Sequence, residues 1–211
     1  MFEPSREPGE FYPAVGVGPH PLPLPTGEHF DQELLLNGDR RNIVEQYRYW
    51  KTEAIKADLA LNRAPVEVAI ENWQHDLNIG SLVRSANAFN VRRVHIIGKK
   101  HWNQHGALMT DKYLDLLHHA SVEEFLAYVS TNQNPLICFE NNTESVPLET
   151  FTFPDNPILA FGNEGLGLSE TLLDAATSVV HISQHGSVRS INASAAGAIA
   201  LFEWQRQNYS Q

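Results

Sequence analysis

Five short apolar runs, separated by segments with helical periodicity, most constrain what this chain can fold into. The runs are VEVAIE (66–71), RVHIIG (93–98), LICFE (136–140), ILAFG (158–162) and SVVHIS (178–183). Helices are expected at residues 79–89, 121–130, 168–176 and 193–207. This alternation predicts an α/β fold with a mostly parallel sheet and helices on both faces. Ligands of such sheets bind at the carboxyl ends of the strands, so we expect function in the segments that begin at residues 98, 140, 162 and 183.

The chain before the first apolar run has a different character. Residues 1–29 are rich in proline and glycine and predict an irregular N-terminal arm. Residues 30–65 are interpreted as a helical extension, with an amphipathic helix over residues 40–61. That helix rests on near-helical spacing of Ile43, Tyr47, Trp50, Ala54 and Leu61. Residues 66–211 are assigned to the α/β domain.

Several classes of protein are disfavoured by composition. Cys138 is the only cysteine, which excludes an intrachain disulfide and a four-thiolate zinc site. The ten histidines form no H-E-x-x-H pattern, so we expect no metal. No apolar run approaches the roughly 18–20 residues of a membrane span, and the N-terminus does not resemble a signal peptide. We therefore expect a cytoplasmic protein without membrane association.

The distribution of charge is uneven. The net charge of −10 argues against a generally basic nucleic-acid binder. Residues 84–110, however, contain five basic residues and no acidic ones, whereas residues 113–188 contain ten acidic residues and no Lys or Arg. Such segregation can create a patch that attracts phosphates, although solvated surface charge explains it equally well. The five basic residues are Arg84, Arg92, Arg93, Lys99 and Lys100.

Three motifs lie at or just past predicted strand ends. They are NIGSLVRSANAF (78–89), FGNEGLGLSE (161–170) and HGSVRSINASAAGAIALFEW (185–204). Each alone has an ordinary explanation. Asn78 can simply cap a helix, the glycines can form a tight turn, and the small residues of the third motif can belong to an alanine-rich helix.

Taken together and in order, the motifs resemble the signatures of the SpoU-type (TrmH-like) RNA 2′-O-methyltransferases of the SPOUT superfamily. The family pattern N-x-G-x-x-x-R-[ST]-A-x-x-F-G is matched over residues 78–89, with Asn90 in place of the last glycine. The pattern G-x-E-x-x-G-L is matched by Gly162, Glu164, Gly167 and Leu168. The pattern S-[LMI]-N-x-[SA]-x-A, which follows a strand end at Ile182, is matched by Ser190, Ile191, Asn192, Ser194 and Ala196. Ile182-Ser183-Gln184 stands where the family usually has I-P-M.

The resemblance implies transfer of a methyl group from S-adenosylmethionine to a ribose 2′-hydroxyl of tRNA or rRNA. It further implies a C-terminal trefoil knot and a homodimer whose active site takes residues from both subunits. The positions that match cofactor contacts are Phe139, Glu140, Gly162, Gly167, Ile182, Ser190 and Ile191. The positions that match catalytic residues are Arg84, Asn78, Glu164, Ser190 and Asn192.

The role of Arg84 stays open between activating the 2′-hydroxyl and orienting the nucleotide. A guanidinium keeps its proton at physiological pH and is a poor base, which favours orientation through a phosphate. RNA contacts are expected from Arg84, Arg92, Arg93, Lys99, Lys100 and Arg189. Arg189 is the sole Lys or Arg between residues 113 and 206, and simple exposure to solvent explains it equally well.

Two other functions compete with this hypothesis. A non-catalytic RNA-binding or ribosome-assembly factor can keep the fold, but it would be expected to lose Arg84, Asn192 or the glycines of the second motif, and all are present. A methyltransferase acting on a protein or a small molecule is disfavoured by the acid-free basic stretch.

Overall fold

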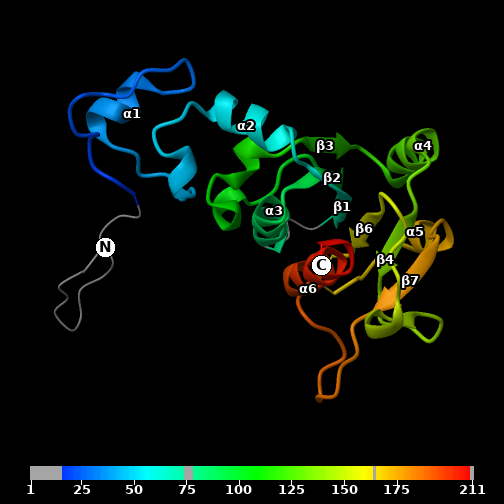
Figure 1. The fold of residues 1–211 in the computed structure, drawn as a ribbon. Helices are drawn as coiled ribbons and strands as arrows, with labels where there is room; N and C mark the ends of the chain where they lie inside the picture. Colours follow the sequence, from blue (N-terminus) through cyan, green and yellow to red (C-terminus); the bar gives the residue numbers. More distant parts are fainter. Residues whose placement is uncertain (1–15, 74–77, 164, 210–211) are drawn as a thin grey trace. The chain divides into compact units, whose positions relative to one another are not determined.

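The computed structural model describes residues 16–73, 78–163 and 165–209. They form two compact units, of which the first ends at Ile55 and the second begins at Lys56 (Figure 1). No helix within the described ranges is long and apolar enough to cross a membrane.

The first unit contains less helix than the spacing of apolar residues predicts. Helix α1 (Gln32–Asn37) begins after Asp31, whose carboxylate accepts hydrogen bonds from two backbone N–H groups of its first turn. Helix α2 covers Thr52–Ala60, with only a short 3₁₀ turn (Glu45–Tyr47) before it. The prediction of one helix over residues 40–61 is therefore wrong in its first half.

Asp39 explains why the chain bends there. Its buried carboxylate accepts hydrogen bonds from the backbone and guanidinium of Arg41 and from the backbone N–H of Tyr49. Tyr49 also has a left-handed backbone, with φ of 63°, which a continuous helix does not allow. Side-chain hydrogen bonds to nearby backbone compete in this way with helical ones.

The second unit is built on a parallel sheet, as predicted. Its strands are β1 (Ala64–Asn72), β2 (Val91–Gly98), β3 (Leu116–His119), β4 (Leu136–Phe139), β5 (Val146–Pro147), β6 (Ile158–Phe161) and β7 (Ser178–His181). Their order in the sheet is β3-β2-β1-β6-β4-β7-β5, and every pairing between neighbours is parallel. The five apolar runs became β1, β2, β4, β6 and β7. Strands β3 and β5 were not predicted because they are short edge strands that lack a continuous apolar run.

Helices cover both faces of this sheet (Figure 1). Helices α3 (Asn78–Ala88) and α6 (Ala193–Tyr209) contribute Leu82 and Trp204 to one apolar cluster. Helices α4 (Val122–Asn132) and α5 (Glu170–Asp174) contribute Phe125 and Leu172 to a second cluster. Strand β1 supplies alternate residues to both, which explains why its sequence is nearly continuously apolar.

The small residues of the third motif bring α6 close to α3. Gly197 faces Leu82, and a methyl group on Gly197 would overlap the Cδ1 atom of that leucine. The stripe therefore packs within the chain, and the outer side of α6 carries the exposed side chains of Ile199 and Phe202.

A buried polar network joins β1, β2, β3 and α4 on the other face of the sheet. The Nε2 atom of His95 lies 2.9 Å from Glu67 Oε2, and its Nδ1 atom lies 3.0 Å from His119 Nε2. Because a carboxylate only accepts, His95 donates to Glu67 from Nε2. The Tyr128 hydroxyl donates to Glu67 and accepts a hydrogen bond from Arg93. Every member of the network thus has a hydrogen-bond partner, which a buried polar group needs.

This network makes the fold sensitive to acid. Burial, and then the proximity of His95, lower the pKa of His119. Burial alone would raise the pKa of Glu67, but the hydrogen bond from His95, its charge and the hydrogen bond from Tyr128 lower it overall. A group whose pKa is lower in the folded state contributes stability above its unfolded pKa and loses it as the pH falls. For His119 the loss begins near its ordinary value of 6.5.

We therefore expect the melting temperature to fall between pH 7 and pH 5, and to fall less in a His119→Gln variant. Glutamine can donate to His95 but does not titrate. Thermal unfolding at constant ionic strength measures this, with His105→Gln, an exposed histidine outside the network, as the matched control. Equal pH dependence of the wild type and His119→Gln would contradict the assignment.

Candidate active site

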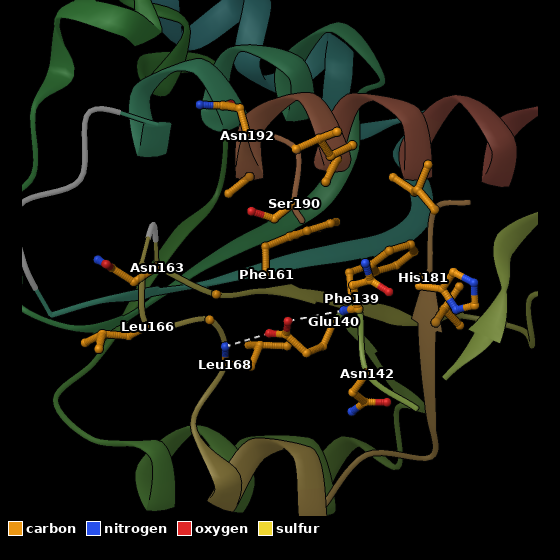
Figure 2. Close-up of a pocket in the computed structure, with 18 of the residues that line it drawn as sticks. Phe139, Glu140, Asn142, Phe161, Asn163, Leu166, Leu168, His181, Ser190 and Asn192 are labelled. Atoms are coloured by element: carbon orange, nitrogen blue, oxygen red, sulfur yellow. Dashed lines mark hydrogen bonds between the residues drawn. The ribbon is translucent and has the colours of Figure 1, made fainter. Parts of the chain in front are cut away.

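A cavity of about 700 Å³ lies at the carboxyl ends of β4, β6 and β7 (Figure 2). Its walls come from residues 139–142 at the end of β4, 161–163 and 165–168 at the end of β6, and 180–182 and 184 at the end of β7, together with residues 190–193 at the start of α6. The volume lies within the range of about 300–1,000 Å³ that is usual for small-molecule sites. The carboxyl ends of the strands, where we expected ligands to bind, therefore line a cavity of suitable size.

The predicted cofactor contacts all lie on this cavity. Its lining includes Phe139, Glu140, Gly162, Gly167, Ile182, Ser190 and Ile191. They come from three strand ends and the segment before α6, which are far apart in sequence. The structure thus brings the second and third motifs to one cavity, while their contacts with a cofactor stay a prediction.

Glu140 holds the loop of the second motif in place. Its Oε2 atom accepts a hydrogen bond of 3.1 Å from the backbone N–H of Leu168, drawn as a dashed line in Figure 2. Its Oε1 atom accepts one of 3.2 Å from the N–H of Asn141. Gly167, with φ of 70°, leaves the space that this carboxylate occupies. Glu140 therefore connects β4 to the loop after β6 and forms part of the cavity wall.

Gly162 allows the same loop to fold back on itself. The backbone N–H of Asn163 donates to Gly167 O, and the N–H of Gly167 donates to Asn163 O. In this arrangement a Cβ atom on residue 162 would overlap the main chain of Gly167 and Leu168. The glycine is thus required by a backbone-to-backbone approach that no side chain can relieve.

Two buried polar atoms on the cavity wall have no hydrogen-bond partner among the described residues. They are Asn163 Nδ2, a donor, and Gln184 Oε1, an acceptor. Leaving such groups unpaired costs about 1–3 kcal/mol each, which a polar ligand would recover. The sequence analysis missed both residues, because Asn163 occupies the variable position of G-x-E and Gln184 departs from I-P-M.

Asn192 links the start of α6 to the start of α3. Its Oδ1 atom accepts hydrogen bonds from the backbone N–H groups of Ser194 (2.9 Å) and Ala195 (3.2 Å), as a helix cap does. Its Nδ2 atom donates to Asn78 Oδ1 at 2.5 Å. Asn78 is buried, whereas Asn192 lines the cavity. Asn192 is therefore both the cap of α6 and a residue of the cavity wall.

Substitutions at Asn192 can separate these two roles. Asn192→Ala should lower the free energy of unfolding by about 1–2 kcal/mol and reduce turnover. Asn192→Ser can still cap α6 but is too short to reach Asn78, so it should recover stability without recovering turnover. Melting temperatures and methyl-transfer kinetics measure the two effects. Wild-type turnover in Asn192→Ser would reduce Asn192 to a helix cap.

The remaining catalytic predictions have mixed outcomes. Ser190 lines the cavity, and Glu164 lies outside the described residues. Arg84 is exposed on α3 and does not line the cavity of its own chain. Arg189 is exposed beside the cavity, where its backbone carbonyl accepts a hydrogen bond from Asn141 Nδ2. One chain thus assembles part of the predicted catalytic set, and Arg84 is not in that part.

Four basic residues of the acid-free stretch lie at opposite ends of strand β2. Lys99 and Lys100 are exposed just after β2, at the same edge as the cavity. Arg92 and Arg93 lie at the amino end of β2, where Arg92 contacts Asn156 and Glu67 and Arg93 contacts Asp115 and Glu67. Both side chains therefore already have partners within the chain, and their predicted contacts with RNA stay a prediction.

Thiol chemistry is not supported by this structure. Cys138 is buried in β4, and burial, reinforced by the charges of Glu71 and Glu140, raises its pKa to about 12. The sulfur therefore stays protonated and is a poor nucleophile. Among the described residues, no group of three or more His, Cys, Asp or Glu side chains is arranged to hold a metal ion.

Comparison with known proteins identifies the family. The model of the SpoU rRNA methylase family matches residues 65–202, which include the first two motifs, the third as far as residue 202, and every wall of the cavity. The chain belongs to the SpoU methylase family. A protein of Synechocystis sp., provisionally named tRNA (cytidine(34)-2′-O)-methyltransferase, is 30% identical over 149 residues, or 67% of this chain and 96% of that protein.

Solved structures of family members share the fold. The tRNA modifying enzyme TrmH/SpoU of A. aeolicus aligns with a TM-score of 0.67 and 22% identity over 75% of this chain and 83% of that one. The SpoU methyltransferase AviRb of Streptomyces viridochromogenes, in complex with the cofactor AdoMet, aligns with a TM-score of 0.63 and 24% identity over 73% of this chain and 65% of that one. The likeness supports the α/β assignment made from the apolar runs.

Proposed function

We propose that this SpoU methylase binds S-adenosylmethionine in the cavity and methylates a ribose 2′-hydroxyl of tRNA or rRNA. The observation that carries the proposal is the convergence of the second and third motifs on one cavity, with the first motif joined to it through Asn78 and Asn192. Family membership and the name of the cyanobacterial relative support this reaction and RNA substrate.

The cavity fits this cofactor in both size and chemistry. The wall offers backbone groups from the Gly162–Leu168 loop and from Ile182 and Ile191, and these would hold the adenosine. Asn163 Nδ2 and Gln184 Oε1 offer an unpaired donor and acceptor to a ligand that carries both kinds of group. When bound, the cofactor supplies a methyl group on a positively charged sulfur. Glu140, which forms part of the wall, offers a complementary negative charge.

The chain's own residues position the nucleotide. Ser190 and Asn192 lie on the wall and would orient the ribose by hydrogen bonds, and Asn78 fixes the amide of Asn192. Arg84 holds a phosphate of the nucleotide and so aligns the 2′-hydroxyl. Most of the rate enhancement then comes from positioning, which can supply about 7–11 kcal/mol of a barrier.

The exposed position of Arg84 supports a homodimeric site. Helices α3 and α6 cover the same face of the sheet, so their outer sides form one surface. That surface carries Arg84 together with the exposed apolar side chains of Ile199 and Phe202. A second copy packed there would bury the apolar side chains and offer its Arg84 to the cavity. The trefoil knot implied by the family and the role of the N-terminal helices in choosing the RNA belong to the same proposal.

Two experiments test the proposed function. Calorimetry with S-adenosylmethionine should show binding, and the non-catalytic alternative predicts none. Mapping 2′-O-methyl positions in total RNA from cells with and without the gene should show at least one position that depends on the protein. Cofactor binding without any such position would mean that the substrate is not RNA.

A further inference from the structure

An exposed tryptophan stands at the carboxyl end of β1. Trp73 is 36% exposed, so part of its large aromatic surface is open to a ligand. Its ring lies against Gly98, where a Cβ atom would come within 2.7 Å of Trp73 Cε3 and Cζ3. Its Nε1–H donates to Glu71 Oε1 at 3.1 Å. The ring is therefore held in one orientation by the backbone on one side and by a hydrogen bond at its edge.

The backbone that carries two lysines is held beside this ring. The amide of Asn72, which is fully buried, donates to the backbone carbonyls of Lys99 and His101, and Asn72 O accepts from the N–H of Lys99. These bonds tie the segment after β2 to the residue that precedes Trp73. Lys99, Lys100 and His101 are exposed there.

The ring is also connected to the cavity. Glu71, the only carboxylate bonded to Trp73 within the described chain, is itself buried. Its second oxygen, Oε2, accepts a hydrogen bond of 2.7 Å from the backbone N–H of Ser169. Ser169 directly follows Leu168 of the cavity wall. One buried carboxylate thus fixes both the exposed ring and the end of the second-motif loop.

We propose that Trp73 is a stacking platform for an unpaired base of the RNA substrate, with Lys99 and Lys100 contacting the neighbouring phosphates. The inference rests on the proposed function, because it takes RNA as the substrate. Proteins that bind single-stranded or looped RNA combine aromatic rings, on which bases stack, with basic side chains along the backbone. A ring fixed before binding loses little conformational entropy when a base stacks on it.

Binding of bulk tRNA tests the proposal directly. Trp73→Ala should weaken binding about 5- to 150-fold, the range that corresponds to loss of one base–aromatic stack. Trp73→Phe, which keeps a ring but lacks the N–H, should stay within about fivefold of the wild type. Tyr209→Ala, which removes another exposed aromatic ring, is the matched control and should bind normally.

The dependence on salt separates stacking from charge. Trp73→Ala should leave the slope of log affinity against log salt unchanged, whereas the double variant Lys99→Ala/Lys100→Ala should reduce it by about 1–2. Affinity for S-adenosylmethionine and sedimentation should stay at wild-type values in Trp73→Ala.

Three results would overturn the proposal. Normal tRNA affinity in Trp73→Ala would remove the stacking role. Weaker tRNA binding together with weaker cofactor binding would make Trp73 a support for Glu71 and the loop. A change of oligomeric state would make it an interface residue. Failure of the wild type to bind tRNA or rRNA would instead refute the proposed function itself.

Discussion

Replacing Arg84 with alanine should lower methyl transfer by about 100-fold or more and leave the affinity for S-adenosylmethionine nearly unchanged. The reason is geometric, because Arg84 is exposed on α3 and does not line the cavity that we assign to the cofactor. Loss of one preorganised group that acts on the transition state commonly costs about 100- to 1,000-fold in rate. Calorimetry and single-turnover kinetics measure the two quantities separately.

Lys112→Ala provides the control for this substitution, since Lys112 is an exposed basic residue that does not line the cavity. It should retain activity. Full activity of Arg84→Ala would remove Arg84 from the mechanism, and loss of cofactor binding would show that it acts through the fold.

Mixed dimers can reveal which subunit supplies Arg84. A subunit with Arg84→Ala has an intact cavity, and a subunit with Gly162→Ala has an intact Arg84. If the site is shared between copies, dimers of these two inactive variants, purified through two different tags, should recover activity at one of their two sites. If Arg84 serves its own cavity, the mixed dimer should be as inactive as either parent.

Gly162→Ala should abolish most cofactor binding. The added methyl group would overlap the backbone of Gly167 and Leu168, and main chain cannot move aside as a flexible side chain can. Overpacking of this kind costs about 1–3 kcal/mol, and relief by opening the loop would displace Leu168 from Glu140. Affinity for S-adenosylmethionine should fall about tenfold or more.

Gly186→Ala is the matched control, because a Cβ atom there meets nothing within 4 Å. Gly186 lies between the third and fourth cavity segments, and the Gly186→Ala variant should bind cofactor normally. Wild-type affinity in Gly162→Ala would mean that the second-motif loop can relax without cost, and it would remove this loop from the proposed cofactor site.

Prediction from the sequence succeeded where local hydrophobicity decides the structure. It failed where hydrogen bonds between separate residues decide it. The apolar runs that became β1, β2, β4 and β6 are largely buried on both faces, and the half-buried β7 is also rich in apolar residues, so hydrophobicity alone identifies all five. The helix predicted over residues 40–61 was wrong because Asp39, Arg41 and Tyr49 satisfy each other's hydrogen bonds in a bend. No periodicity of apolar residues contains that information.

For the site, the sequence by itself determined the strand ends and the three motifs, and hence the residues that line the cavity after β4, β6 and β7. Only the tertiary structure decided how these residues are used. It paired Glu140 with Leu168, joined Asn192 to Asn78, placed Arg92 and Arg93 at the far edge, and left Arg84 outside the cavity. The physical reason is that strand ends follow from local hydrophobicity, whereas hydrogen bonds between loops up to 114 residues apart depend on the order of strands in the sheet.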